Sequence, residues 1–324
     1  EKLVSLTLEK FGMDGFALGM DYRSAGSLKM YPLVLDHTRA FVKIQDGCNL
    51  RCSFCLTTVA RGASHSRSPD EIVREVQDLA DKGCREVVLT GVHAGSYGVR
   101  DLDLGALLER ILNETPIPRL RLSSLEPWNF KFSWIELWQR FAERLCPHLH
   151  MSLQSGSDSM LQRMRRPYDS AAYAEKINQL QSTIPNMAIT TDIIVGFPGE
   201  TPAEHNESVT FVRSMAFSGA HVFTFSPRPG TDAATLPDQL PAGMKKERYR
   251  EMKDVTAATA ATYRDAMIGR NLSVLWEELS GEDTVTGLSE NYLRVEGPRR
   301  DAALNTISSV DIESVDGDIL RGSS

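Results

Sequence analysis

Three cysteines close together in the sequence are the residues best suited to carry chemistry. Cys48, Cys52 and Cys55 lie within the segment CNLRCSFC, after the apolar stretch AFVKI and the turn QDG. Three thiolates on one loop can bind three irons of a [4Fe–4S] cluster and leave the fourth iron without a protein ligand. A metal site binds substrate at such an open position. We therefore predict that these cysteines hold an iron–sulfur cluster, which is both the metal centre and the catalytic centre.

Zinc binding and simple burial are the competing interpretations of these thiols. Structural zinc takes four ligands, commonly from Cys-x2-Cys pairs. The sequence has no second pair, so His65, ten residues after Cys55, would have to complete the site. Three thiols so close together in a polar loop argue against burial alone. The other two cysteines, Cys84 and Cys146, are isolated, and we interpret each as a small buried hydrophobic residue.

The composition indicates a protein of the reducing cytoplasm. The cysteine count of five is odd, and the cysteines are not spaced in pairs as in a secreted disulfide framework. No stretch approaches the roughly 20 apolar residues that span a bilayer, and the start of the chain lacks the features of a secretory signal. A net charge of −7 argues against broad, nonspecific nucleic-acid binding.

The elements that must position the cysteines alternate between strand and helix over residues 37–266. Alternating units imply a parallel sheet with right-handed crossovers. Six of them suggest a curled sheet or partial (βα)6 barrel, with the active site at the C-terminal ends of the strands. The strand candidates are Ala40–Ile44, Glu86–Thr90, Arg119–Leu125, His148–Gln154, Met187–Val195 and His221–Phe225.

Two of the intervening helices carry start signals. The segments SPDE (68–71) and TPAE (201–204) each predict a capping box with proline at the first helical position. The first helix then places apolar residues on one face. These are Ile72, Val73, Val76 and Leu79.

One predicted strand suggests a polar barrel interior. Alternation in His148–Gln154 puts His148, His150, Ser152 and Gln154 on one face and Leu149, Met151 and Leu153 on the other. The polar face either lines a wet cavity suited to a polar substrate, or its groups satisfy one another inside the barrel.

The pattern changes after residue 266. NLSVLWEELSG, TVTGLSENYLRVEG and the segment Ile307–Leu320 predict short strands separated by Gly or polar turns, which is typical of a small antiparallel β-barrel. Residues 1–36 are interpreted as a lead-in or linker from a preceding domain. The expected division is therefore 1–36, 37–266 and 267–324.

The sequence resembles the radical S-adenosylmethionine (AdoMet) superfamily, and within it the methylthiotransferases. The C-x3-C-x2-C spacing after the first strand is that of the superfamily. The segments GCNLRCSFC, RGASHSRSPDEIVREV, VVLTGVHAGSYG, RLSSLEP, SLQSGSDSMLQRMRR, TDIIVGFPGET and FSPRPGTDA look like the methylthiotransferase blocks, in their order. The C-terminal segment is similar to the RNA-binding TRAM domain that ends these enzymes. The resemblance covers residues 38–322.

One block points to a branch of the family. TGVHAGSYG (90–98) resembles the enzymes that methylthiolate N6-threonylcarbamoyladenosine next to the tRNA anticodon. The isopentenyladenosine branch usually has Gln-Asn here, and the branch acting on a ribosomal protein aspartate usually has Gln-Asp-Thr. The resemblance implies a [4Fe–4S] cluster, AdoMet, a tRNA substrate and an electron donor such as flavodoxin or ferredoxin. It implies no membrane.

The resemblance also implies a mechanism and further site residues. The reduced cluster cleaves AdoMet to methionine and a 5′-deoxyadenosyl radical, which removes hydrogen from C2 of the modified adenine. Sulfur is then inserted, and a second AdoMet supplies the methyl group. The residues expected around AdoMet are Phe54, Thr90, Gly91, Ser124, Glu126, Asp192 and Gly196. Packing is the alternative for Phe54, and a structural role for Asp192. Arg165 and Arg166 are candidates for the AdoMet carboxylate or a phosphate, with a solvated helix end as the favoured interpretation.

The chain departs from the family in two respects. The family normally has an N-terminal domain with three further cysteines for a second cluster, which carries the sulfur to be inserted. Two isolated cysteines cannot replace it, so this chain is expected to cleave AdoMet without inserting sulfur, and we predict the additional domain in the native protein.

The second departure is the charge of residues 267–324. This segment has five arginines and eleven acidic residues, a net charge of −6, although RNA binding favours cationic groups. The candidate phosphate contacts are Arg294, Arg299 and Arg300. The basic run Lys245, Lys246, Arg248, Arg250 and Lys253 is interpreted as a solvated helix face. The alternative functions are methylthiolation of a ribosomal protein aspartate and a non-catalytic, metal-containing RNA-binding protein.

Overall fold

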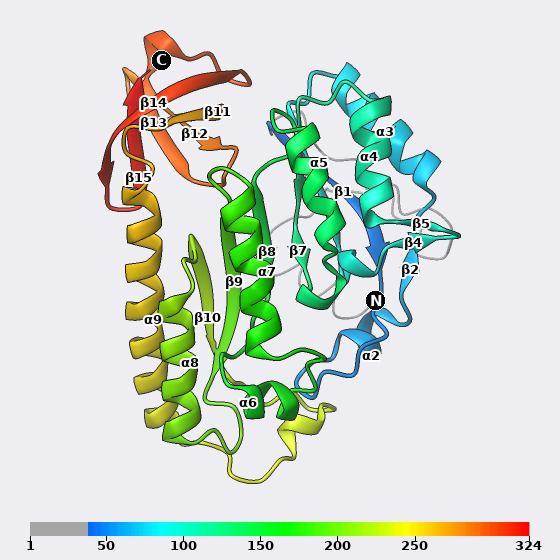
Figure 1. The fold of residues 1–324 in the computed structure, drawn as a ribbon, viewed down its shortest axis with the longest axis vertical. Helices are drawn as coiled ribbons and strands as arrows, with labels where there is room; N and C mark the ends of the chain where they lie inside the picture. Colours follow the sequence, from blue (N-terminus) through cyan, green and yellow to red (C-terminus); the bar gives the residue numbers. More distant parts are fainter. Residues whose placement is uncertain (1–37, 324) are drawn as a thin grey trace, which may run out of the picture. The chain divides into compact units, whose positions relative to one another are not determined.

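The structure, a computed structural model, describes residues 38–323. The predicted lead-in of residues 1–36 lies outside the described residues. The buried apolar side chains form one large core between Ala40 and Val255 and a separate core between Met267 and Leu320. The two cores correspond to a curved α/β sheet and a small β-barrel (Figure 1).

The α/β part contains six parallel strands, if β6 and β7 are counted as one interrupted strand, and this confirms the predicted partial barrel. Its first sheet has the order β2-β1-β3-β6 and its second the order β10-β9-β8-β7, and a bridge between Leu120 and Leu145 links the two. The third predicted strand is split at Ser123 into β6 and β7. The bounds are β1 (Arg39–Asp46), β2 (His65–Ser66), β3 (Glu86–Gly91), β6 (Arg119–Leu122), β7 (Ser124–Leu125), β8 (His148–Met151), β9 (Ala188–Val195) and β10 (Gly219–Thr224).

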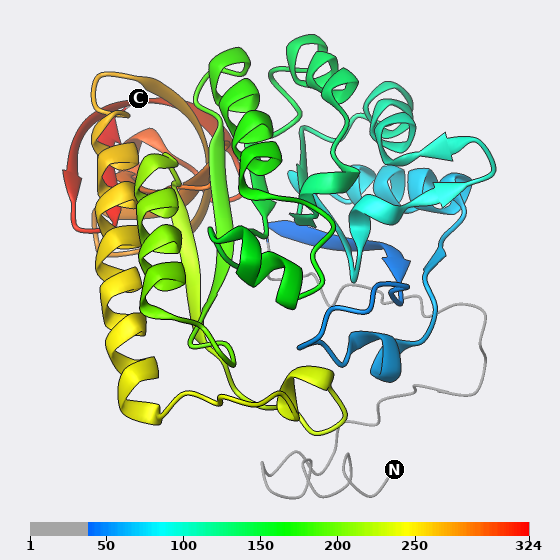
Figure 2. The same cartoon turned by 60° about the horizontal axis from the view of Figure 1, so that its bottom comes forward.

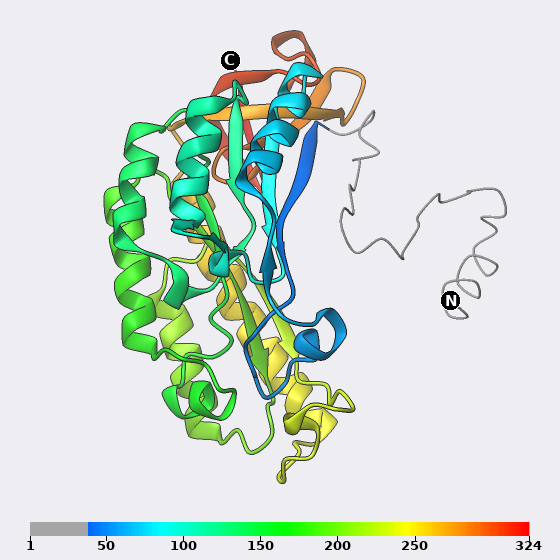
Figure 3. The same ribbon diagram turned by 90° about the vertical axis from the view of Figure 1, so that its right-hand side faces the viewer.

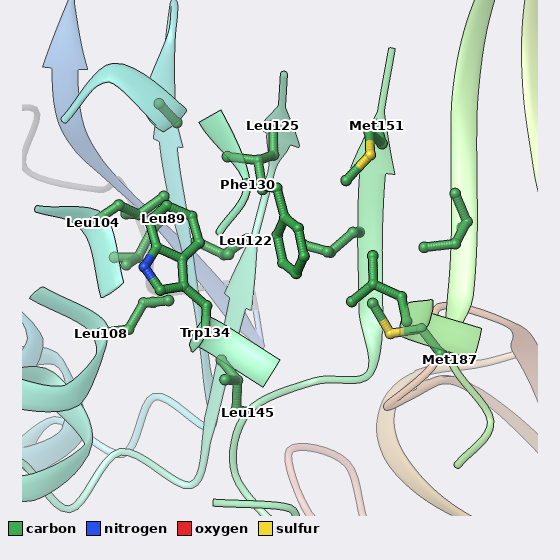
Figure 4. Close-up of a cluster of buried hydrophobic side chains, with 14 of the residues drawn as sticks. Leu89, Leu104, Leu108, Leu122, Leu125, Phe130, Trp134, Leu145, Met151 and Met187 are labelled. Atoms are coloured by element: carbon green, nitrogen blue, oxygen red, sulfur yellow. The ribbon is translucent and has the colours of Figure 1, made fainter. Parts of the chain in front are cut away.

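Helices α3, α4, α5 and α7 lie on one side of these strands (Figures 1 and 3). Alternate strand residues pack against them, and the buried Trp134 contacts α4 where Gly105 leaves room for its ring. Figure 4 shows Trp134 beside Leu104 and Leu108 of α4. The bounds are α2 (Thr57–Arg61), α3 (Pro69–Asp81), α4 (Leu104–Glu114), α5 (Ile135–Arg140), α6 (Asp158–Arg163), α7 (Ser170–Thr183), α8 (Pro202–Ser214) and α9 (Ala242–Asp265), with a small β4 (Gly98–Val99) and β5 (Leu102–Asp103) hairpin.

Of the two predicted capping boxes, one is confirmed and one is wrong. Thr201 accepts from the backbone N–H of Glu204, and the Glu204 side chain accepts from the N–H of Thr201. Ser68 precedes α3 as expected, but its side chain makes no capping hydrogen bond. Its backbone (φ −57°, ψ 131°) differs from that of Thr201 (φ −81°, ψ 163°), and its hydroxyl does not reach the third helical N–H.

The C-terminal strands close into a barrel of order β11-β12-β13-β15-β14. The pairs are antiparallel except β13 with β15, which is parallel. Trp276 fills the centre, and Gly297 leaves space for its ring. The strands are β11 (Asn271–Leu279), β12 (Thr284–Ser289), β13 (Arg294–Pro298), β14 (Ile307–Asp316) and β15 (Ile319–Ser323).

Two buried arginines join this barrel to the start of β6. Arg119 donates to the carbonyl oxygens of Ser273 (2.5 Å) and Leu288 (3.1 Å). Arg121 donates to that of Ser289 (3.2 Å) and pairs with the buried Glu86 (2.7 Å). The barrel therefore contacts the N-terminal ends of the strands, whereas the cysteine loop with α2 follows the C-terminal end of β1 (Figure 2).

Candidate active site

The cysteine loop begins where β1 ends and turns at a glycine. Gly47 has a φ of +72°, a left-handed conformation that favours glycine. A Cβ atom at this position would lie 2.0 Å from the carbonyl oxygen of Ala63. The N–H of Cys48 donates to the carbonyl oxygen of Gly62 at 3.0 Å. The two ends of the loop are thus tied together, and the first thiol is placed next to the end of the sheet.

The three sulfur atoms differ in exposure but share one feature, a nearby hydrogen-bond donor. Cys48 is buried, Cys52 is half-buried and Cys55 is exposed. Donors to sulfur favour the thiolate over the thiol and help to set the potential of a bound cluster. The donors are Leu50 N–H for Cys48 (3.4 Å), the Arg166 guanidinium for Cys52 (3.2 Å) and Thr57 N–H for Cys55 (3.4 Å).

Burial keeps the first thiol of the loop protonated until a metal binds it. Burial raises the pKa of Cys48, and the other two thiols and Glu126 add to this effect. A coordinating metal removes the proton from such a thiol. His65, the candidate fourth ligand for zinc, is exposed, and its Nδ1 lies 3.4 Å from the carbonyl oxygen of Ala63 in its own loop. The donor set therefore fits a cluster held by three thiolates.

Glu126 presents a free carboxylate oxygen beside this loop. It follows β7, and its side chain is 15% exposed. Among the described residues, its Oε2 has no hydrogen-bond partner. His93 Nε2 lies 3.4 Å away but is engaged at 2.7 Å with Asn129 Oδ1. Burial raises the pKa of Glu126, and the nearby His93 and Arg166 oppose that shift. The structure thus places this predicted residue beside the cysteine loop, with one buried oxygen that has no hydrogen-bond partner among the described residues.

Arg166 is not part of a solvated helix end, and that interpretation is wrong for this residue. Its guanidinium lies over the rings of Trp128 (4.7 Å) and Tyr168 (5.6 Å) and donates to Cys52. Its buried Nε has no hydrogen-bond partner within residues 38–323. Burial alone would lower the pKa of Arg166, but Tyr168 and Cys52 raise it. Arg165, by contrast, is exposed and pairs with Asp232.

These two free groups fit the amino-acid part of AdoMet. That part carries one ammonium and one carboxylate. The Glu126 oxygen and the Arg166 N–H offer the complementary charges close to the cysteines, and charged partners of this kind form the stronger hydrogen bonds. The residues present therefore suit AdoMet bound next to a cluster.

The remaining predicted residues fall in different surroundings. Gly91, at the end of β3, has little space, since a Cβ atom would lie 3.0 Å from Gln45 Oε1. Thr90 precedes it and is half-buried, and Ser124 at the start of β7 is exposed. The neighbouring Ser123, which we did not predict, has a buried hydroxyl with no hydrogen-bond partner in the described part of the chain.

Phe54 and Gly196 belong to the packing around the loop. Phe54 packs against a small cluster that includes Phe197 and Phe225. Gly196 follows β9 with a φ of +72°, and its N–H donates to Glu200 Oε2 at 2.7 Å. Glu200 in turn pairs with Arg248. Arg248 is 5% exposed, so the predicted solvated basic face of α9 does not include it.

Asp192 lies on β9 in a different group of side chains. Its carboxylate is 3.1 Å from His150 Nε2 and 3.3 Å from the Ser152 hydroxyl. Leu149 and Met151 are buried in the main core, so the predicted alternation of β8 is confirmed. The polar side chains satisfy one another only in part, since the buried Nδ1 of His148 has no hydrogen-bond partner among residues 38–323. His150 and Asp192 also remain partly exposed.

His93 is the residue at this site that sequence reasoning missed. Its Nδ1 lies 3.9 Å from Cys48 Sγ, and its backbone N–H donates to Gln45 Oε1 at 2.8 Å. It also contacts the ring of Trp128 edge-on. Its place in the segment TGVHAGSYG, directly after the end of β3, was the signal that could have identified it.

No helix in the described part of the chain is long and apolar enough to cross a membrane.

A model of the Radical SAM superfamily matches residues 42–212, which contain the cysteine loop, Glu126 and Arg166. The match thus covers the residues that form the site.

Three characterised relatives are similar over most of the chain. The threonylcarbamoyladenosine tRNA methylthiotransferase MtaB of Bacillus subtilis is 37% identical, over 82% of this chain and 60% of its own length. MtaB of Thermotoga maritima is 36% identical, over 89% of this chain and 68% of its own length. The tRNA-2-methylthio-N(6)-dimethylallyladenosine synthase of Moorella thermoacetica is 37% identical, over 76% of this chain and 56% of its own length. The chain therefore spans between 56% and 68% of the length of these relatives.

Solved structures share the fold at low sequence identity. Coproporphyrinogen III oxidase (HemN) from Escherichia coli, described as a radical SAM enzyme, is 12% identical with a TM-score of 0.51, over 79% of this chain and 67% of that chain. The methyltransferase TsrM from Kitasatospora setae is 18% identical with a TM-score of 0.52, over 60% and 38%. By its cysteine loop, its partial barrel and these relatives, the chain belongs to the radical SAM superfamily and, within it, to the methylthiotransferase family.

Proposed function

We propose that this chain is the catalytic core of a tRNA methylthiotransferase whose substrate is N6-threonylcarbamoyladenosine next to the anticodon. The observation that carries the chemistry is the pair of free buried groups, on Glu126 and Arg166, beside three donor-supported thiols. The substrate is supported by the segment TGVHAGSYG and by two relatives named for this modification.

Each residue of the site has a distinct task in this proposal. When bound, the cluster and AdoMet supply reductive cleavage of AdoMet and a carbon radical that can remove a hydrogen atom. Cys48, Cys52 and Cys55 hold the cluster. Glu126 binds the ammonium group of AdoMet and Arg166 its carboxylate. The aromatic rings on which Arg166 stacks fix its plane and exclude water, which strengthens both contacts.

Sulfur insertion needs more than this chain in the same proposal. Cys84 donates to the carbonyl oxygen of Glu86, and Cys146 is 2% exposed. Burial raises the pKa of both thiols, that of Cys146 to about 12. Neither is suited to bind a second cluster. The chain alone is proposed to cleave AdoMet without inserting sulfur.

The proposed partners and divisions follow from the same family. Residues 37–266 form the radical AdoMet core and residues 267–324 a TRAM domain in this proposal. A reduced flavodoxin or ferredoxin supplies the electron, and the protein works in the cytoplasm.

The C-terminal barrel favours a second candidate, methylthiolation of a protein side chain. Two of its arginines are engaged with acidic neighbours, which leaves less positive charge for phosphates. Arg294 pairs with Glu278, and Arg321 with Glu296 and Asp316. An acidic barrel of this kind suits a basic protein.

Formation of 5′-deoxyadenosine tests the proposal. Reconstituted protein is reduced with dithionite without oxygen, with and without tRNA carrying threonylcarbamoyladenosine, beside Cys48→Ala. We expect product that depends on Cys48 and increases with this tRNA. Product that is indifferent to the tRNA but increases with a ribosomal-protein substrate would favour the second candidate. No product from protein with a full cluster would exclude both.

A further inference from the structure

A second group of potential metal ligands lies on the polar face of β8, β9 and β10, apart from the cysteine loop. These strands are neighbours in one sheet (Figure 1). His221 is the register partner of Asp192, and His150 is that of Thr190, two residues earlier on β9. One ligand atom from each of His150, Asp192 and His221 lies within 4.8 Å of the other two. The sheet itself therefore brings two imidazoles and a carboxylate together.

The three side chains are reachable from solvent. The alternate residues of the same strands, including Leu149, Ile193 and Val222, are buried in the main core. The polar side chains consequently point away from it. Those of His150 and Asp192 are 13% and 28% exposed, and His221 is exposed. A metal ion on these ligands would have positions open to water or to an oxygen donor of a substrate.

In one of its two hydrogen-bonding directions, a threonine hydroxyl holds the first imidazole in a ligand orientation. Thr190 Oγ1 lies 3.0 Å from His150 Nδ1 and 3.1 Å from His148 Nε2. A hydroxyl donates once and also accepts, so this chain of contacts works in either direction. When His150 Nδ1–H donates to Thr190, the hydroxyl donates to His148. His150 Nε2 then presents a lone pair towards Asp192. Protein metal sites commonly fix a ligating histidine through its other nitrogen in this way.

The carboxylate and the lone pair then need a cation between them. Asp192 presents its carboxylate to the same ring. With His150 in the orientation described, its Nε2 lone pair faces that anion at 3.1 Å. A proton or a metal ion relieves the repulsion.

We propose that His150, Asp192 and His221 form a binding site for a divalent transition metal ion, best suited to zinc. Two imidazoles and one carboxylate are typical zinc ligands, bound at about 2.0–2.2 Å. The ion displaces the proton between His150 Nε2 and Asp192, and the exposed His221 ring closes the site by rotation. Thr190 orients the first ligand without touching the metal. The inference is independent of the proposed function.

Zinc content of the intact, cluster-reconstituted protein tests the site. The protein is equilibrated with micromolar Zn²⁺, excess metal is removed, and zinc and iron per chain are measured together. We expect zinc in addition to the cluster iron, and a loss of affinity of about 100-fold or more in His221→Ala, beyond the usual cost of losing an outer contact. Thr190→Val keeps the shape of the side chain but removes its hydroxyl. Its affinity for zinc is expected to fall about 10- to 100-fold.

A matched histidine variant separates this site from the cysteine loop. His65→Ala removes an exposed histidine beside the thiols and is expected to leave zinc affinity unchanged. The inference is overturned if the wild type retains no zinc. It is also overturned if His221→Ala binds zinc as tightly as the wild type, or if His65→Ala loses the zinc and His221→Ala does not. Thermal melting of each variant confirms that it is folded, and the exposure of His221 makes its substitution the safest of the ligand variants.

Discussion

At the scale of single residues, the site depends on polar atoms held without partners. Glu126 could be predicted as a site residue from the sequence, because it follows the end of a predicted strand, where the active sites of such barrels lie. Arg166 was a candidate as well, but a solvated helix end was the favoured interpretation of its Met-Arg-Arg-Pro segment. Its partners Cys52 and Trp128 are far away in the chain, so only the fold reveals the stack. His93 was missed for the same reason, since Cys48 approaches it from another strand end.

Arg166→Lys is expected to weaken AdoMet binding and to lower the reduction potential of the cluster. Lysine keeps the charge but loses the planar stack and the bond to Cys52. A hydrogen bond between charged groups contributes about 1.5–3 kcal/mol, or roughly 10- to 150-fold in affinity. Equilibrium binding of AdoMet and a redox titration followed by electron paramagnetic resonance measure the two effects.

Arg165→Lys is the control for this variant, because Arg165 is exposed and contacts Asp232 instead of the thiols. It is expected to match the wild type in both measurements. Equal affinity and potential in the two variants would remove Arg166 from the AdoMet site.

At the scale of elements, the strands were predictable and the loop geometry was not. The strand candidates agree with the observed strands to within a few residues, because each is a short apolar run or an alternation of apolar and polar residues. The cap of α3 was predicted wrongly, since the sequence SPDE does not determine the backbone angles of Ser68. The tight contact between Gly47 and Ala63 was likewise invisible in the sequence, because it joins two ends of one loop.

Gly47→Ala is expected to impair cluster binding. The new Cβ atom would meet the Ala63 carbonyl oxygen, and a left-handed alanine costs about 1–2 kcal/mol in addition. The loop must shift, which moves Cys48. Iron and sulfide per chain after reconstitution measure the loss.

Gly83→Ala provides the comparison for that variant. Gly83 also has a positive φ (+86°), but its added Cβ atom would have no neighbour within 4 Å. Gly83→Ala is expected to have a lower free energy of unfolding, because its backbone is strained in the same way, but to bind as much iron as the wild type. If both variants hold the same iron, the Gly47 contact is not what positions the cysteines.

At the scale of the whole molecule, the buried charges at the start of the strands hold the small barrel in place. Glu86 is fully buried and pairs with Arg121 at 2.7 Å, with Arg119 at 3.7 Å. The alternation Arg-Leu-Arg-Leu in β6 could have indicated this, because arginine inside a barrel needs a partner. The sequence does not show that the acceptors come from residues 273–290.

Glu86→Gln is expected to lower the free energy of unfolding by about 3–5 kcal/mol, because it leaves buried arginine charge uncompensated. Burial would raise the pKa of Glu86, but Arg121 and Arg119 lower it below its ordinary value of 4.5. A lowered folded-state pKa stabilises above the unfolded value. The contribution is therefore complete above about pH 4.5 and is lost as the pH falls through the lowered pKa. Urea unfolding at several pH values measures it.

Glu114→Gln, which breaks an exposed ion pair, is the control for this variant. Glu114 contacts Arg110 on the surface of α4, and exposed pairs contribute less than about 1 kcal/mol. A Glu86→Gln variant no less stable than Glu114→Gln would contradict the assigned role of the buried network.

The contacts between the arginines and the barrel also bear on how the two parts can diverge. Arg119 and Arg121 bond chiefly to main-chain carbonyl oxygens of Ser273, Leu288 and Ser289. Main-chain acceptors survive most substitutions, so the outer surface of the barrel can acquire a new target while its attachment persists. Deleting the barrel, by contrast, would strip acceptors from two buried cations. Its binding role is therefore best studied by surface substitutions, since a truncation would alter recognition and folding together.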